Sequence, residues 1–146
     1  MSAQEYDAMH LQYNNKTNKI SLADVLKSIY DDKSLSIFQL IADMSPNGEV
    51  SIKKLGLSRK QYYSRTSAMV KNGLIKRQSG RYYFTALGKV AYCCIMILKN
   101  ALNNFYDLKV VEVTEAHNKL SNEEFTKLVD ALIDNQQVKE FLIKKC

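Results

Sequence analysis

Eleven lysines and arginines lie in residues 50–106, and this stretch contains no aspartate or glutamate. The rest of the chain holds 10 basic and 15 acidic residues, so the formal net charge of +6 comes entirely from one segment. Basic residues without interspersed acids create a positive potential that attracts polyanions, whereas an ordinary solvated surface mixes both signs. We therefore expect residues 50–106 to bind nucleic acid.

The residue types that most often act in catalysis or bind metals, such as histidine and cysteine, are scarce in this chain. The chain has two histidines, His10 and His117, and it contains neither a glycine-rich phosphate loop nor a nucleophile elbow. Of its three cysteines, Cys93 and Cys94 are adjacent, which is not the spacing of metal ligands or of a disulfide framework. We predict no enzymatic activity, no bound metal and no cofactor. The apolar surroundings of Cys93 and Cys94 predict small buried residues, and a redox-sensing thiol is the alternative.

Two short helices separated by a tight turn are expected to position the basic residues. Ser51 is a predicted N-cap for a helix over residues 52–55, which Gly56 ends. Ser58 is the predicted N-cap of a longer helix over 59–72, which ends at Gly73. Apolar side chains in this second helix recur with a 3.6-residue period and should pack on the core, namely Tyr62, Thr66, Met69 and Val70.

A β-hairpin is expected directly after this helix. Residues 74–78 and 81–84 are rich in strand-forming residues, and Ser79-Gly80 between them is suited to a tight turn. Basic residues surround the tip of the hairpin. In the second strand, Tyr82 and Phe84 alternate with Arg81 and Tyr83, so one of these two pairs should face the core. Thr85 then caps a long helix.

The stretch LSRKQYYSRTSAMVKNGLIKRQSGRYYFTALGKVAY, residues 57–92, resembles the winged helix-turn-helix domain of archaeal transcriptional regulators. It is more distantly similar to MarR-type bacterial repressors. The matching features are Asn72-Gly73-Leu74-Ile75 after the second helix, the basic hairpin, and Thr85-x-x-Gly88 at the start of the next helix. The resemblance implies a mainly α fold with a small β-hairpin wing, followed by C-terminal accessory helices. It also implies a regulator of transcription that reads double-stranded DNA through the major groove.

Carried over position by position, the resemblance implies a set of DNA contacts. The exposed side of helix 59–72 would contact base edges or the backbone, and the preceding helix and the wing would contact phosphates. Arg65 is expected on phosphate, and Gln61 on adenine. The residues expected to bind DNA are Lys53, Lys54, Ser58, Arg59, Lys60, Gln61, Tyr63, Ser64, Arg65, Lys76, Arg77 and Arg81.

The remainder of the chain sets the domain organisation. Residues 1–19 are polar and aperiodic and are expected to be a flexible tail. Residues 20–106 should form the DNA-binding domain, with amphipathic helices near 21–29 and 34–44 preceding the helix-turn-helix unit. Residues 107–146 should be accessory helices: 108–113 could be extended or helical, Ser121 and Glu124 form a capping box, and a short helix closes the chain.

The long helix after Thr85 and the helices after Ser121 offer more apolar surface than one small domain can bury, which predicts a homodimer. The longest apolar run, residues 90–98, is far shorter than the roughly 18–20 residues needed to cross a bilayer. We therefore expect a cytoplasmic protein with no membrane segment. The alternative to a DNA reader is a winged-helix module that binds an acidic protein partner.

Overall fold

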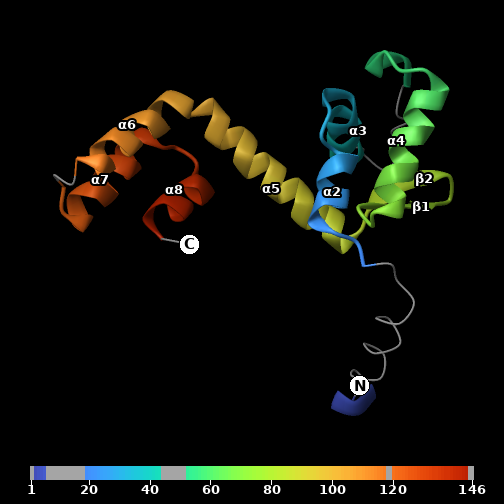
Figure 1. Ribbon diagram of the computed structural model, residues 1–146, viewed down its shortest axis with the longest axis horizontal. Coiled ribbons are helices and arrows are strands. Elements are labelled where there is room, and N and C mark those ends of the chain that lie inside the picture. Colours follow the sequence, from blue (N-terminus) through green and yellow to red (C-terminus); the bar gives the residue numbers. More distant parts are fainter. Residues whose placement is uncertain (1, 6–18, 44–51, 118–119, 145–146) are drawn as a thin grey trace. The chain divides into compact units, whose positions relative to one another are not determined.

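The computed structural model describes residues 2–5, 19–43, 52–117 and 120–144, and of residues 52 and 53 it describes the backbone alone. In this part of the chain the protein is mostly helical, with one two-stranded antiparallel hairpin (Figure 1). Contacts divide the chain into two compact units, Met1–Val90 and Ala91–Cys146. The predicted boundary, after residue 106, lies further along the chain. Most of the predicted tail, together with Met44 and the predicted N-cap Ser51, lies outside the described residues.

The first unit begins with two helices that acidic side chains help to cap. Helix α2, Leu22–Ser28, starts at a capping box in which Ser21 and Asp24 accept hydrogen bonds from each other's backbone N–H. Helix α3, Asp32–Asp43, begins two residues before the helix expected near 34–44, so Ser34 and Ser36 lie inside it and neither is its N-cap. The carboxylate of Asp31 accepts from the backbone N–H of Lys33 and of Ser34, at 3.1 and 3.0 Å, because it stands directly before the first turn.

A 3₁₀ helix and an α-helix follow in the order predicted from the sequence. The 3₁₀ helix η1 is Ile52–Leu55, and Gly56 ends it with a φ of +62°. Helix α4 is Arg59–Lys71, and Asn72 stands at its C-cap. The Asn72 side chain donates to the carbonyl of Asp24 (3.1 Å) and to Ser28 Oγ (2.6 Å), which fastens the end of α4 to α2.

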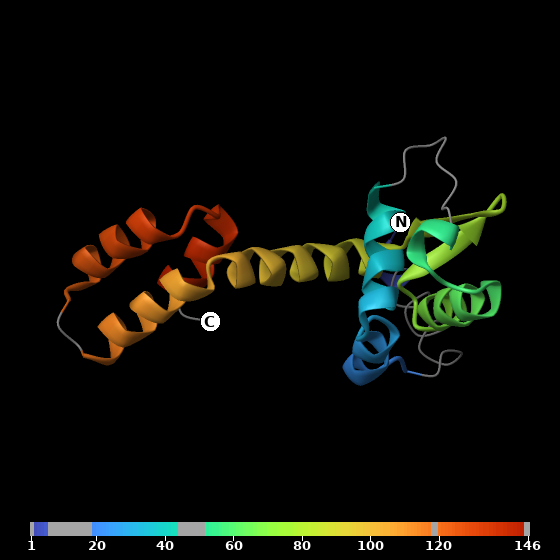
Figure 2. The same ribbon diagram turned by 90° about the horizontal axis from the view of Figure 1, so that it is seen from above.

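The hairpin consists of β1, Ile75–Gln78, and β2, Arg81–Phe84. Both residues of its two-residue turn have positive φ, +51° at Ser79 and +77° at Gly80, which is the geometry of a type I′ turn. Strand β1 packs on α4 and strand β2 on α3, so α4 and the hairpin lie side by side (Figure 2). The core beneath them is formed by fully buried side chains from three elements and the loop before β1, namely Ile37, Phe38, Thr66, Met69, Leu74 and Ile75.

A close backbone contact joins the hairpin to the next helix, α5, Ala86–Asn103. Thr85 caps α5 as predicted, because its Oγ1 accepts from the N–H of Gly88 at 3.0 Å. The carbonyl oxygen of Leu74 accepts from the Thr85 N–H and lies so near Gly88 that a Cβ on Gly88 would be 1.9 Å from it. Only glycine fits at residue 88 without a shift of the backbone.

The second unit contains α6, Phe105–Ala116, α7, Asn122–Leu132, and α8, Gln136–Ile143. Its buried residues are Val111, Val129, Ile133 and Val138, and Ile97 of α5 packs against this cluster. The predicted capping box at Ser121 and Glu124 is present. Residues 108–113, ambiguous from sequence, are helical.

Several apolar positions are more exposed than the sequence indicated. Val70 is 42% exposed, because it lies at the edge of the apolar face of α4, so its predicted place in the core is wrong. Leu22 and Leu26 on α2 are also exposed. Cys93 and Cys94 were expected to be buried, and both are free and exposed. No described helix is long and apolar enough to pass through a membrane.

Candidate nucleic-acid interface

Helix α4 has one buried and one polar, exposed face. Tyr62, Thr66 and Met69 are buried and fix the helix on the core, as their spacing predicted. The Thr66 hydroxyl donates to the Tyr62 carbonyl at 3.1 Å, so this fully buried polar group has a hydrogen-bond partner. The predicted contact residues Arg59, Lys60, Tyr63 and Ser64 are all exposed.

The exposed face continues along the whole length of α4. Lys60, Ser64, Ser67 and Lys71 are exposed and follow the i, i+4, i+7, i+11 spacing of one helical face. Lys71 was missed as a contact residue, although its spacing from Lys60 could have identified it. The result is a helix surface with a lysine at each end and two short hydroxyl side chains between them.

Gln61 helps to cap helix α4, a role that was not predicted from the sequence. Its Oε1 accepts from the Ser58 N–H at 3.1 Å, and Ser58 Oγ accepts from the Gln61 N–H at 3.2 Å. A two-bond contact with adenine uses the amide oxygen as acceptor and the amide nitrogen as donor. Because the oxygen already accepts one hydrogen bond in this capping box, the cap fixes its direction, and a two-bond contact with adenine would have to share this oxygen or break the cap. Ser58 Oγ accepts in the same cap and keeps its hydroxyl hydrogen as a donor.

Arg65 is paired within the protein. Its Nε lies 3.4 Å from Oδ1 of Asp31, and each side chain is 27% exposed. The hydrogen bond from the Ser34 side chain, and to a lesser degree the Arg65 charge, lowers the pKa of Asp31, so the carboxylate is ionised at neutral pH. A phosphate contact by Arg65 would have to compete with this ion pair.

The basic residues of the hairpin lie on its two faces. Arg77 pairs across the strands with Tyr82, and Ile75 pairs with Phe84, so these four side chains share the face that packs on the protein. Lys76 and Arg81 alternate with them and are exposed on the opposite face, together with Tyr83. Of the two possible core pairs, Tyr82 and Phe84 are therefore the inner one, and the Phe84 ring lies 4.6 Å from that of Phe38.

Aromatic rings connect Arg77 to helix α4. The Arg77 guanidinium lies over the Tyr82 ring, 5.9 Å from its centroid, and the ring of Tyr82 is 6.4 Å from that of Tyr62. Burial raises the pKa of the Tyr62 hydroxyl, and the nearby positive charge of Arg77 opposes this rise. Arg77 is thus an exposed cation held on the side of the hairpin that faces α4.

Among the predicted residues of η1, Lys54 is exposed, whereas the side chain of Lys53 lies outside the described residues. The structure therefore brings together two sets of basic residues, those on the outer face of α4 and Arg77 beside it. Lys76 and Arg81 extend from the far face of the hairpin. Acidic side chains are absent from η1, α4 and the hairpin by sequence, so no carboxylate of these elements offsets their charge.

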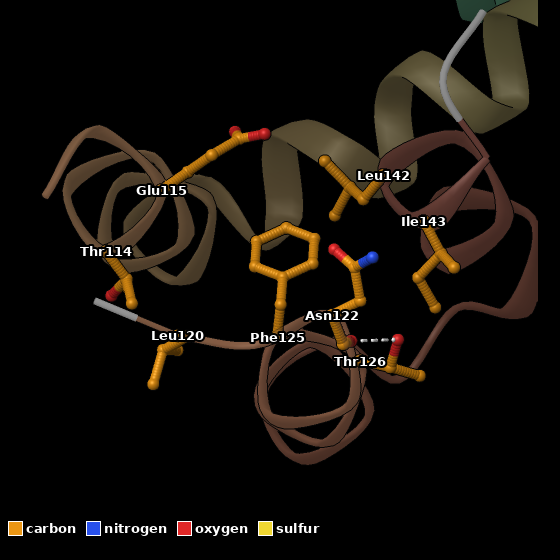
Figure 3. A pocket seen from close by; sticks show the side chains of 8 residues that line it. All are labelled: Thr114, Glu115, Leu120, Asn122, Phe125, Thr126, Leu142 and Ile143. Carbon is orange, nitrogen blue, oxygen red and sulfur yellow. Dashed lines mark hydrogen bonds between the residues drawn. The ribbon is translucent and has the colours of Figure 1, made fainter. Parts of the chain in front are cut away.

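The second unit contains an open pocket of about 450 Å³ between α6, α7 and α8. Its lining includes the carboxylate of Glu115, the amide of Asn122 and the ring of Phe125, which points toward Glu115 and Leu142 (Figure 3). The Thr126 hydroxyl at its edge donates to the Asn122 carbonyl at 2.9 Å. In the part of the chain that the structure describes, no three histidine, cysteine or acidic side chains are grouped as metal ligands.

No protein-family model, curated protein or solved structure matches this chain.

Proposed function

We propose that the first unit is a winged helix-turn-helix domain that binds duplex DNA and regulates transcription. In this proposal α4 enters the major groove, which is wide enough for one α-helix, and the hairpin contacts the adjacent backbone. The observation that carries it is the exposed face of α4, with Lys60 and Lys71 at its ends and no acidic residue on α4 or on the hairpin.

The chemistry of this face fits DNA better than it fits a protein partner. Lys71 neutralises a phosphate at one side of the groove, and Arg59 and Lys60 at the helix start reach either guanine O6 and N7 or a phosphate. Ser64 and Ser67 carry hydroxyls that donate or accept, so they can contact either base edges or phosphates. Tyr63 adds an aromatic ring with a polar tip, and its position on the same face places it at the groove wall.

The other predicted contacts follow from the geometry of the hairpin and η1. Arg77, held over Tyr82 on the α4 side, would contact phosphates next to the groove that α4 enters. Lys54 would contact the backbone across which the preceding helix lies. Gln61 and Ser58 serve mainly as the cap of α4, and Arg65 serves mainly to hold α4 against the start of α3.

The decisive experiment measures binding of the full chain to duplex DNA of random sequence as the salt concentration rises. With about 6–10 phosphate contacts, affinity should fall by roughly 10³–10⁵ between 50 and 200 mM salt. Lys60→Ala and Arg77→Ala should each weaken binding and reduce the salt slope by about one. Lys127→Ala, in the second unit, is the matched control and should leave both unchanged.

Absence of DNA binding at low salt would refute the proposal and favour a module that binds an acidic protein. Selection of bound sequences from a random duplex pool then measures specificity. If Arg59 or Lys60 reads a base, its replacement by alanine costs about 1–3 kcal/mol at one position of the site. Equal losses on every sequence would mean that α4 contacts the backbone only.

We further propose that the protein acts as a homodimer. One reading helix covers only a few base pairs, so a regulator of this size gains specificity when two copies bind two half-sites related by a two-fold axis. A palindrome in the selected sequences is the expected result.

A further inference from the structure

Helix α5 carries an apolar stripe that nothing in the described structure covers. Leu98 and Leu102 are 63% and 62% exposed, and Cys94 is exposed one turn before Leu98. The same spacing continues toward the start of the helix at Leu87 and Val90, which are 45% and 60% exposed. We define the α5 stripe as Leu87, Val90, Cys94, Leu98 and Leu102.

The spacing within the α5 stripe is symmetrical. Val90 and Leu98 each lie four residues from Cys94, and Leu87 and Leu102 lie seven and eight residues from it. If two α5 helices cross antiparallel at Cys94, each Val90 meets a Leu98 and each Leu87 meets a Leu102 of the other copy. A two-fold interface requires such self-complementarity, since each surface must match itself after rotation.

The charges of α5 also favour a second copy of the chain as the partner. The stripe has no charged residue, so a two-fold arrangement brings no like charges together. The two charged residues of the helix, Lys89 and Lys99, lie outside it, each at least a quarter-turn from its centre at about 100° per residue. A small residue, Cys94, at the centre lets two helices approach closely while the larger residues fill the space on either side.

The exposed area agrees with this role. Four large side chains that are about half to two-thirds exposed give an apolar patch of a few hundred Å², the size at which such patches mark interaction sites. A stable interface covers about 800 Å² on each partner, with an apolar centre and a more polar rim. The stripe supplies the apolar centre, and Ile95, about a quarter-turn from Cys94, is only partly buried and lies at its edge.

We propose that two copies of this chain pair through the α5 stripe, antiparallel and with the two Cys94 side chains at the two-fold axis. The pairing itself rests on α5 alone. Its consequence, that two α4 helices are presented to one DNA duplex, rests on the function proposed above.

The adjacent cysteines provide an internal test of the proposal. A chain whose only cysteine is Cys94, made by Cys93→Ser and Cys146→Ser, should form a covalent dimer when a copper–phenanthroline oxidant is added. Each disulfide forms as two thiols release two protons and pass two electrons to the oxidant. The matched chain whose only cysteine is Cys93 should react at least about tenfold more slowly, because a disulfide requires its two Cα atoms within about 7 Å. Equal rates would overturn the assignment of Cys94 to the axis.

A charge placed on the stripe should separate the copies. At micromolar concentration, native mass measurement should give twice the chain mass for the natural protein and 16.7 kDa for Leu98→Glu. Lys99→Glu, the next residue and outside the stripe, is the control and should remain dimeric, with equal helix content by circular dichroism. A monomeric natural protein overturns the proposal, and so does a Leu98→Glu variant that stays dimeric.

The antiparallel direction is tested by mixing two variants in a cysteine-free background, Leu87→Cys and Leu102→Cys. Antiparallel helices give the mixed disulfide, whereas parallel helices give each variant bonded to itself.

The outcomes of these experiments also separate this inference from the proposed function. A chain that pairs through α5 and does not bind DNA refutes DNA binding alone. A monomer that binds DNA refutes the α5 pairing and the proposed homodimer, and leaves DNA binding standing.

Discussion

Replacement of Gly88 by alanine tests the contact that joins the hairpin to α5. Gly88 lies in the first turn of a helix, where alanine is normally more stable than glycine by about 1 kcal/mol. Helix propensity alone therefore predicts that Gly88→Ala stabilises the protein. The structure predicts the opposite sign.

The magnitude follows from the position of the Leu74 carbonyl. An added Cβ would lie 1.9 Å from its oxygen, whereas real Cβ contacts are essentially never shorter than 3.0 Å, so the backbone must move by about 1 Å. That oxygen accepts from the Thr85 N–H and from Thr85 Oγ1, both at 3.1 Å. Overpacking costs about 1–3 kcal/mol, and weakening these hydrogen bonds costs about 0.5–1.5 kcal/mol each. After the gain in propensity of about 1 kcal/mol, we expect a net loss of about 1–5 kcal/mol.

Urea or thermal unfolding followed by circular dichroism measures this loss. Gly56→Ala is the matched control, because Gly56 has a φ of +62° and its added Cβ would have no atom within 4 Å. The control carries only the cost of a left-handed backbone, about 1–2 kcal/mol. A Gly88→Ala protein as stable as the natural one, or more stable, would refute the close approach of Leu74.

Three further predictions concern the caps and contacts of the first unit. The pKa of Asp31 is lowered, chiefly by the Ser34 hydrogen bond, so the contribution of Asp31 to stability is present above its unfolded pKa and is lost as pH falls through its folded pKa. In unfolding experiments below about pH 4, the natural protein should therefore lose more stability than Asp31→Asn. Parallel curves of stability against pH for the two proteins would argue against this role. Asn72→Ala should lower the free energy of unfolding by about 1–3 kcal/mol, because it removes both hydrogen bonds that Asn72 donates to α2. Its exposed neighbour provides the control, and Lys71→Ala should change the free energy of unfolding by less than about 0.5 kcal/mol. Gln61→Glu should preserve the capping box, whereas Gln61→Ala should lower the free energy of unfolding by about 1 kcal/mol, measured by thermal unfolding. Equal stabilities of Gln61→Ala and the natural protein would show that the amide does not act as a cap.

Local signals in the sequence predicted most elements of the first unit. Ser58 and Thr85 cap helices because a hydroxyl before an exposed backbone N–H is sufficient for this role, whatever the rest of the fold. Ser79-Gly80 forms the hairpin turn because Gly80 adopts positive φ without steric cost, and Ser79 takes the matching φ of +51° beside it. The buried face of α4 followed from periodicity at Tyr62, Thr66 and Met69.

Interactions between distant residues were not predictable in the same way. The pair of Arg65 with Asp31 joins residues 34 positions apart, and nothing local to either residue indicates it. The exposure of Cys93 and Cys94 was missed because an apolar helical run has the same spacing whether its partner is its own core or a second molecule. Val70 illustrates the same limit, since a position at the edge of an apolar face is buried only if a neighbouring element reaches it.

If the first unit binds a duplex as proposed, the contact between Tyr62 and Tyr82 limits which duplexes it can bind. These rings hold the hairpin against α4. The distance between the exposed face of α4, which would enter a groove, and Arg77, which would contact the flanking strand, is therefore fixed before binding. B-form DNA offers a groove wide enough for a helix, whereas double-stranded RNA has a deep, narrow one that side chains cannot read. The protein should therefore reject an RNA duplex of identical base sequence on shape alone.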